Sequence, residues 1–209
     1  MNSFETDLIR AIKSKGFWMS LILELIVLFT AGYQSDLFRM CVPVLCTFPY
    51  TTAWLKEYQS GFLKAALPRT SRNGYIWGKF FSCGISGGGV EVLGVWLWSF
   101  FAADGTVTAW YPVLLFLSGF LWASLAAVLA AWVNSRYLAY GSSFVIYYLL
   151  VILHQRYFKQ LYCLDPYEWI QPAHTWLMGV WGVGGLVVGL IGIMGISYYG
   201  ILRRCMESV

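Results

Sequence analysis

Residues 111–134, YPVLLFLSGFLWASLAAVLAAWVN, contain no charged side chain. Because a helix rises about 1.5 Å per residue, this run is long enough to cross the roughly 30 Å apolar core of a bilayer. The rest of the chain has the same character: 59% of its 209 residues are hydrophobic and 11% are charged. An ordinary soluble domain is roughly 25% charged. The sequence therefore predicts an integral membrane protein.

Five more apolar runs lie on either side of this one, at about 17–33, 40–55, 79–102, 138–155 and 175–202. Each is long enough, or nearly so, to be a membrane-spanning helix. We therefore predict an all-α integral membrane fold in which residues 17–209 form one domain of six transmembrane helices. No small-residue cleavage site follows the first run, so we expect it to be a retained helix and not a signal peptide.

The residues before the first run predict an amphipathic helix over 1–16 that lies on the membrane surface. One face of this helix is apolar and the opposite face is charged. The apolar face consists of Phe4, Leu8, Ala11 and Ile12, and the polar face of Glu5, Asp7, Arg10 and Lys13. Basic residues on such a face favour contact with anionic membrane lipids.

The basic residues predict the orientation, because Lys and Arg near the ends of spans are retained on the cytoplasmic side. With a cytoplasmic amino terminus, six spans place eleven of the fourteen basic residues inside: Arg10, Lys13, Lys15, Lys56, Lys64, Arg69, Arg72, Lys79, Arg136, Arg203 and Arg204. Arg39, Arg156 and Lys159 fall outside. We therefore expect a multi-pass protein of the cell (plasma) membrane with both termini in the cytoplasm. Topology accounts for the formal net charge of +4, and no nucleic-acid partner is expected.

The polar stretch 57–79, EYQSGFLKAALPRTSRNGYIWGK, separates the second and third runs. Apolar residues recur at helical spacing at its start, opposite a stripe of Lys56, Ser60 and Lys64. Pro68 ends this pattern, because proline lacks an amide donor and disfavours helical geometry in the residue before it. The stretch therefore predicts a short amphipathic helix followed by a basic turn, in a loop of about 56–78.

The loop resembles the first cytoplasmic loop of type 2 ATP-binding-cassette permeases, which have an exporter-like architecture. The residues that carry the resemblance are Glu57, Ser60, Gly61, Leu67, Pro68, Ser71, Arg72, Gly78 and Lys79. The amino-terminal amphipathic helix, the six spans and an aromatic segment before the last span extend the resemblance over essentially the whole chain. Phe62 departs from the pattern, because the family often has a small polar residue there.

The resemblance implies that this helix is a coupling helix that docks into a groove on a separate ATPase. The implied docking residues are Glu57, Tyr58, Ser60, Gly61, Phe62, Lys64, Leu67, Pro68, Arg69 and Arg72. It also implies a permease subunit that pairs with a second permease, identical or related, and exports a peptide, a lipid or a drug-like molecule. ATP and Mg²⁺ would bind to the partner ATPase. A solvated, positively charged loop is the simpler alternative.

The chain shows no ATPase motif of its own. The closest candidate, GYIWGKF at 74–80, has three residues between its glycines where a phosphate-binding loop has four, and Phe80 stands where a hydroxyl should bind magnesium. We therefore expect no enzymatic activity and no cofactor or metal in this chain. The five cysteines form no CxxC pair, so packing is their expected role.

Two other functional classes fit a six-span chain of this size. One is the substrate-capture subunit of a vitamin importer, which would need a buried polar pocket of its own. The other is a rhomboid-like intramembrane protease, suggested by GISG at 84–87. The protease is disfavoured, because the predicted topology places Ser86 far from His154 and His174, which lie near the outer segment.

Two carboxylates, Glu24 and Glu91, lie within predicted spans. Charge at that depth is costly, so both should face other helices or a wet cavity, or be protonated. They could line a substrate path, or they could make an interhelical hydrogen bond that fixes packing. The aromatic segment 155–175 is expected to form short helices in, or dipping into, the outer membrane interface.

Overall fold

The fold was obtained as a computed structural model, which describes residues 3–62, 71–102, 108, 110–176 and 178–207. This part of the chain forms helices and no strand, which confirms the predicted all-α class. The helices are α1 (Ser3–Ile12), α2 (Lys15–Ala31), α3 (Asp36–Leu45), α4 (Ala53–Gln59), α6 (Arg72–Phe101), α7 (Tyr111–Val133), α8 (Arg136–Arg156), the 3₁₀ turn η2 (Tyr162–Leu164), α9 (Pro166–Ile170) and α10 (Val180–Glu207).

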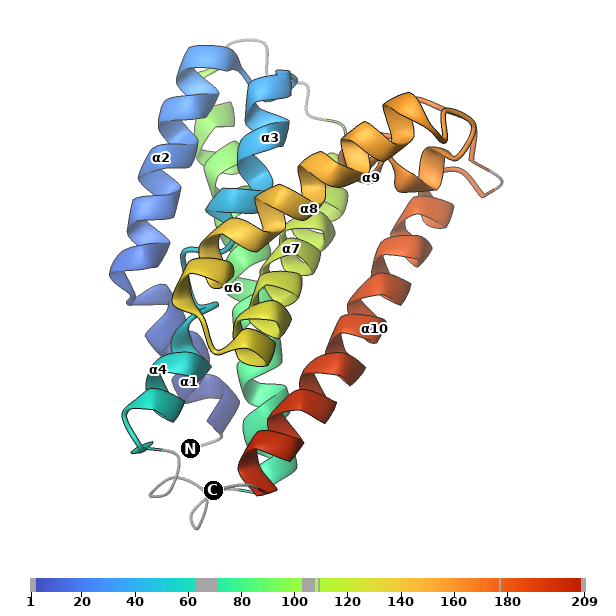
Figure 1. Cartoon of the computed structure of the whole chain (residues 1–209). Coiled ribbons are helices and arrows are strands. Elements are labelled where there is room, and N and C mark those ends of the chain that lie inside the picture. The colour runs from blue at the N-terminus through green and yellow to red at the C-terminus, as the bar shows by residue number, and fades with distance from the viewer. Residues whose placement is uncertain (1–2, 63–70, 103–107, 109, 177, 208–209) are drawn as a thin grey trace.

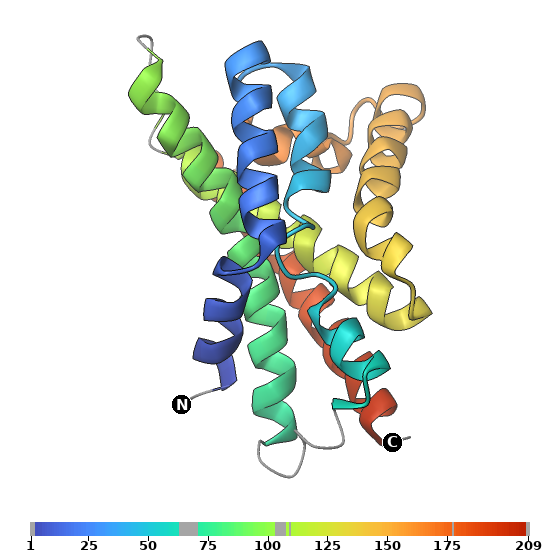
Figure 2. The ribbon, with the colours of Figure 1, turned by 90° about the vertical axis from the view of Figure 1, so that its left-hand side faces the viewer.

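Helices α6 and α7 form the centre of the bundle, and the others pack around them (Figures 1 and 2). Helix α6 also contacts α1 and α2, whereas α7 also contacts α8 and α10. Both chain termini lie at one end of the bundle, together with α1 and α4 (Figure 1). We call this the terminal end, and the opposite end, which carries α9, the far end.

Four helices are long and apolar enough to cross a membrane: α6, α7, α8 and α10. They coincide with four of the six predicted runs. The first run corresponds to α2, which Ser14 caps by accepting a hydrogen bond from the amide of Phe17. Helix α2 joins α1 at a bend of 49°, and this bent pair would make a fifth span if both helices crossed the membrane together.

The predicted span over 40–55 is not one helix. Helix α3 ends at Leu45, residues 46–52 turn, and α4 begins at Ala53. Pro49 lies in this turn and opposes a continuous helix, because proline lacks an amide donor and disfavours helical geometry in the residue before it, whereas Pro43 lies inside α3. The Ser20 hydroxyl donates to the Leu45 carbonyl at 2.6 Å, and Ser14 donates to the Pro49 carbonyl at 3.0 Å. Other parts of the fold thus satisfy carbonyls that the broken helix leaves free.

Glycines allow α6 to pack closely against its neighbours. A Cβ atom on Gly88 would lie 2.4 Å from the Phe116 carbonyl oxygen of α7, and one on Gly87 would lie 2.7 Å from the Cys46 carbonyl oxygen. Real Cβ atoms do not approach this closely. The GISGGG sequence therefore serves a close contact of α6 with α7 and with the turn after α3, as small residues do in membrane bundles.

Helix α1 differs from its predicted pattern. Asp7, expected on the exposed polar face, is buried, whereas Ile9 and Ile12 are exposed. The reason is that α1 packs against α6, where Asp7 finds a buried cation. Periodicity in α1 alone could not reveal this partner, because it lies 72 residues away in the sequence.

Candidate functional site

The terminal end contains a buried ionic network centred on Lys79 of α6. Its ammonium nitrogen lies 2.8 Å from Oδ1 of Asp7 on α1 and 2.6 Å from Oε1 of Glu57 on α4. The hydroxyl of Tyr50, from the turn before α4, lies 3.1 Å from the same nitrogen and donates to Asp7 at 2.8 Å. Four separate segments of the chain therefore meet at one lysine. We call this set, with Arg10 and Tyr75, the Lys79 network.

Glu57 is held from two further directions. Its Oε2 accepts a hydrogen bond of 2.5 Å from the Tyr75 hydroxyl, one turn before Lys79 on α6. The Arg10 guanidinium of α1 lies 3.6 Å from its Oε1. The side chain is only 17% exposed, so this carboxylate points into the fold.

The charges of the Lys79 network balance, since two carboxylates face one ammonium and one guanidinium. Lys79 and Asp7 are almost completely buried. Charged pairs removed from water are stable only when their geometry and their additional hydrogen bonds compensate for lost hydration. Burial, together with the nearby Asp7 carboxylate, raises the pKa of Tyr50. Tyr50 therefore stays protonated and continues to donate its hydrogen bond.

The residues predicted to dock an ATPase divide into two groups. Glu57 and Tyr58 are partly buried, and Tyr58 stacks on the buried Trp54 with ring centroids 5.0 Å apart. Ser60, Gly61 and Phe62 are exposed immediately after α4. Arg72 is the first residue of α6 and is exposed. Four others, Lys64, Leu67, Pro68 and Arg69, lie outside the described residues.

Helix α4 is attached to a second part of the bundle besides the Lys79 network. The amide oxygen of Gln59 accepts hydrogen bonds from the Arg136 guanidinium at 2.6 and 3.1 Å. Arg136 begins α8. A cavity of about 690 Å³ lies beside α4, and Arg10, Lys15, Lys56 and Tyr140 are among its lining residues. The exposed side of α4 thus adjoins a basic hollow.

Glu24 of α2 and Glu91 of α6 are both fully buried in the middle of the bundle. The Glu24 carboxyl packs against Gly94, three residues after Glu91 on α6, since a Cβ on Gly94 would lie 2.2 Å from its carboxyl carbon. Within the described part of the chain, none of the four carboxyl oxygens of Glu24 and Glu91 has a hydrogen-bond partner.

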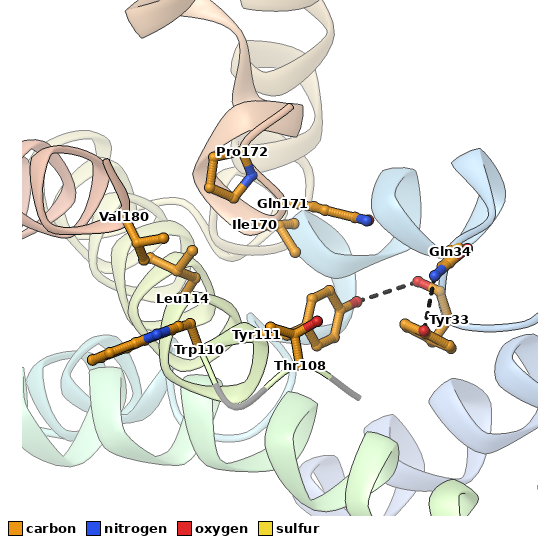
Figure 3. A pocket seen from close by; sticks show the side chains of 10 residues that line it. All are labelled: Tyr33, Gln34, Thr108, Trp110, Tyr111, Leu114, Ile170, Gln171, Pro172 and Val180. Carbon is orange, nitrogen blue, oxygen red and sulfur yellow. Dashed lines mark hydrogen bonds between the residues drawn. The ribbon is translucent and has the colours of Figure 1, made fainter. Parts of the chain in front are cut away.

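A small pocket of about 230 Å³ lies at the far end between the loop before α3, the start of α7, the end of α9 and the start of α10 (Figure 3). The Tyr111 hydroxyl crosses it to donate to the Tyr33 carbonyl at 3.2 Å, and Gln34 donates to the Tyr33 hydroxyl at 2.8 Å. Gln171 also lines the pocket, and its amide oxygen accepts a bond of 2.7 Å from Arg39. The pocket has a mixed polar and apolar lining, and it is smaller than the roughly 300–1,000 Å³ typical of small-molecule sites.

The segment between α8 and α10 contains the predicted short helices, η2 and α9. It is organised by Glu168, which is buried and accepts hydrogen bonds from the Ala173 amide, the Trp176 indole and His174. The His174 ring nitrogen lies 2.8 Å from Glu168 Oε1, and the ring stacks on Tyr162 at 3.9 Å. The Glu168 carboxylate thus fixes Ala173, His174 and Trp176 to α9. We call the segment between α9 and α10 that contains these three residues the far-end loop.

The far-end loop is expected to loosen in acid. Burial acts to raise the pKa of Glu168, but the hydrogen bonds from His174, Trp176 and Ala173 outweigh it and lower the pKa below 4.5. A carboxyl whose pKa is lowered by folding contributes stability above its unfolded pKa and loses it as the pH falls through the folded value. The protection of the amides of residues 173 and 174 from exchange, measured relative to their intrinsic exchange rates, should therefore fall as the pH is lowered through the folded pKa of Glu168. In Glu168→Gln this acid-dependent step should be missing, and a wild-type step of the same size in that variant would contradict the assignment.

The proposed protease residues are spread over separate parts of the fold. The Ser86 hydroxyl donates to the Cys83 carbonyl of its own helix at 3.0 Å. His154 lies 3.7 Å from Asp165, and His174 lies against Glu168 in the far-end loop. Neither histidine has Ser86 as a hydrogen-bond partner among the described contacts, so this geometry offers the serine no general base.

Sequence reasoning missed the partnership of Asp7, Tyr50 and Lys79. Lys79 was assigned to the basic, solvated end of a span, and Asp7 to the exposed face of a surface helix. A usable signal was present, because a lysine one turn into a long apolar helix needs a carboxylate partner. The sequence does not indicate which of its ten acidic residues supplies it.

No family model matches the chain, and no curated protein or solved structure shows significant similarity to it.

Proposed function

We propose that this chain is a membrane-spanning permease subunit of an ATP-binding-cassette transporter, with α4 and the residues after it as the docking element for a separate ATPase. The observation that carries the proposal is the attachment of α4 to the bundle through Glu57. A short helix that only filled a loop would need no charged contact with two other helices. Here Glu57 bonds Lys79 and Tyr75 of α6 and lies beside Arg10 of α1.

This attachment provides a route for mechanical force. A displacement of α4 would move Glu57, and the charged contacts would pass that displacement to α6 and α1. Since α6 packs along most of α7, it could rock the centre of the bundle. Rigid helices joined by a short hinge are the usual means by which such closure reaches a transport path. The expected cargo is a peptide, a lipid or a drug-like molecule, with export as the direction.

Exposed groups on and after α4 supply the docking surface. Phe62 is 49% exposed, and the polar residues Lys56, Gln59 and Ser60, which precede it in the sequence, are exposed as well. An exposed aromatic ring surrounded by polar groups is typical of the anchor of a protein interface. Glu57, by contrast, would transmit force and would not touch the ATPase.

Helix α10 offers a face for a second permease. Gly185, Gly189 and Gly192 have no described atom within 4 Å of the position that a Cβ would occupy. Glycines at this spacing allow the backbone of another membrane helix to approach closely. In a pair of chains, identical or related, two such faces would be in contact. Each chain would then place its α4 helix against one of two ATPases. The alternative of a vitamin-capture subunit has less support, because the far-end pocket is small.

We expect Phe62→Glu to release the ATPase while leaving the bundle folded. Loss of an aromatic interface anchor weakens binding by about 2 kcal/mol or more, roughly 30-fold. The test is copurification of an ATPase with the tagged chain when it is expressed together with its neighbouring genes. Phe158→Glu is the matched control, because Phe158 is 47% exposed and lies just after α8, at the far end of the bundle. If the wild-type chain never retains an ATPase, or if both variants retain equal amounts, the proposal fails.

A further inference from the structure

The burial of the Glu24 and Glu91 carboxyls away from water costs free energy, and the proposed function assigns no role to either group. Both side chains are 0% exposed, and their four oxygens lack hydrogen-bond partners in the described structure. An ionised carboxylate without partners in an apolar interior is strongly unfavourable, and two adjacent ones are worse because they repel. Something that carries positive charge must therefore accompany them.

The two carboxyls lie on one shared surface between α2 and α6. A Cβ on Gly94 would lie 2.2 Å from the carboxyl carbon of Glu24, so this carboxyl is pressed against the backbone of α6. Gly94 is three residues after Glu91, and residues at this spacing share a helix face. Glu24 is therefore aimed at the face of α6 that carries Glu91. On the other side, a Cβ on Gly119 of α7 would lie 3.2 Å from the Cγ of Glu91.

The ionisable neighbours supply no cation to the pair. The titratable groups beside the pair are Cys41 and Cys46 on the α3 side and Tyr111 of α7, and none of these is a cation. The Arg39 guanidinium is bonded to Gln171 and lies 3.8 Å from Asp36. Among the described residues, no ion pair includes Glu24 or Glu91.

A metal ion fits this site poorly. Metals that prefer carboxylates take about six or more oxygen ligands, with several beyond the carboxylates themselves. Here the described residues provide no group of three or more potential metal-binding side chains of the His, Cys, Asp or Glu type. Glycine backbone packs directly against the Glu24 carboxyl and leaves little space on that side. A proton needs neither space nor extra ligands.

We propose that Glu24 and Glu91 form a proton-binding pair that holds at least one proton at neutral pH and joins α2 to α6. The proton is carried as a carboxylic O–H on one of the two residues, so the pair carries at most one negative charge. Loss of the proton would leave two negative charges face to face and push the helices apart. The ligand of this site is thus the proton, independent of whether an ATPase drives the chain.

Infrared spectroscopy of the purified full chain tests the proposal directly, since a protonated carboxylic acid has a C=O stretch distinct from that of a carboxylate. At neutral pH the wild-type protein should show this band. Glutamate labelled with ¹³C at the carboxyl carbon should shift it, which assigns the band to Glu without any mutation. The double variant Glu24→Gln/Glu91→Gln should lose the band. Asp36→Asn, which changes an 80% exposed carboxyl, should keep it.

Three results would overturn the proposal. The first is a wild-type spectrum without the band at neutral pH. The second is a folded double variant that retains the band in full. The third is loss of the band on addition of sodium, potassium or calcium at constant pH, because a metal ion would then be the resident cation. The labelled wild-type sample decides the question if the double variant does not fold.

Discussion

Replacing Lys79 with methionine is expected to destabilise the protein by about 3–5 kcal/mol, because it removes one partner of a buried ion pair and leaves the other charged. Methionine keeps most of the volume of the lysine stem. What is lost is the ammonium group within 2.8 Å of Asp7 and 2.6 Å of Glu57. Asp7 suffers most, since Arg10, its other cation, is 3.9 Å away. The measurement is denaturant unfolding of the purified chain in detergent micelles.

Lys56→Met is the matched control, because Lys56 is an exposed lysine on α4 with no ion pair among the described residues. Its effect should stay within about 0.5 kcal/mol, as for most surface changes. A rescue experiment separates charge from packing. Adding Asp7→Asn to Lys79→Met leaves one carboxylate, Glu57, beside one guanidinium, Arg10, and should recover much of the lost stability. Equal destabilisation by the two lysine variants would contradict the Lys79 network.

The substitution Gly88→Ala is expected to destabilise the bundle by about 1–3 kcal/mol, the usual cost of overpacking a dense core. The added methyl group would lie 2.4 Å from the Phe116 carbonyl oxygen, which belongs to the backbone of α7 and cannot rotate away. Helices α6 and α7 would have to separate along their contact. The same unfolding measurement in detergent reports this loss.

Gly89→Ala provides the control at the next residue. No described atom lies within 4 Å of its added Cβ, so the methyl group meets open space. Alanine is also the better helix former by about 1 kcal/mol, so this variant should be as stable as the wild type or more stable. If Gly88→Ala proved as stable as Gly89→Ala, the close contact between α6 and α7 would be wrong.

Some features of the fold could be predicted because they depend on local composition. The runs 79–102, 111–134, 138–155 and 175–202 are predominantly apolar, and each corresponds to a helix able to cross a membrane. The short helices before the last span were also predictable from their prolines and aromatic residues. A short helix from about Leu55 to the residue before Pro68 was predicted from its apolar spacing; α4 covers the first part of it, and residues 63–70 lie outside the described residues.

Other features could not be predicted because they depend on contacts between distant residues. The apolar run 40–55 looks continuous by hydropathy, but Pro49 and the hydroxyls of Ser14 and Ser20 stabilise a break instead of a span. In the same way, Glu57 was expected on a docking surface and lies inside the Lys79 network.

The sequence by itself determined that the chain is helical and rich in helices that can enter a membrane, because hydrophobicity and helix length act within one segment. Only the tertiary structure decided which charged residues are buried and which residues lie next to them. Asp7 meets Lys79 and Glu24 meets the face of α6 that carries Glu91 because α6 packs against both α1 and α2. The free energy of a buried charge is set by its neighbours in space, and these neighbours are far away along the chain.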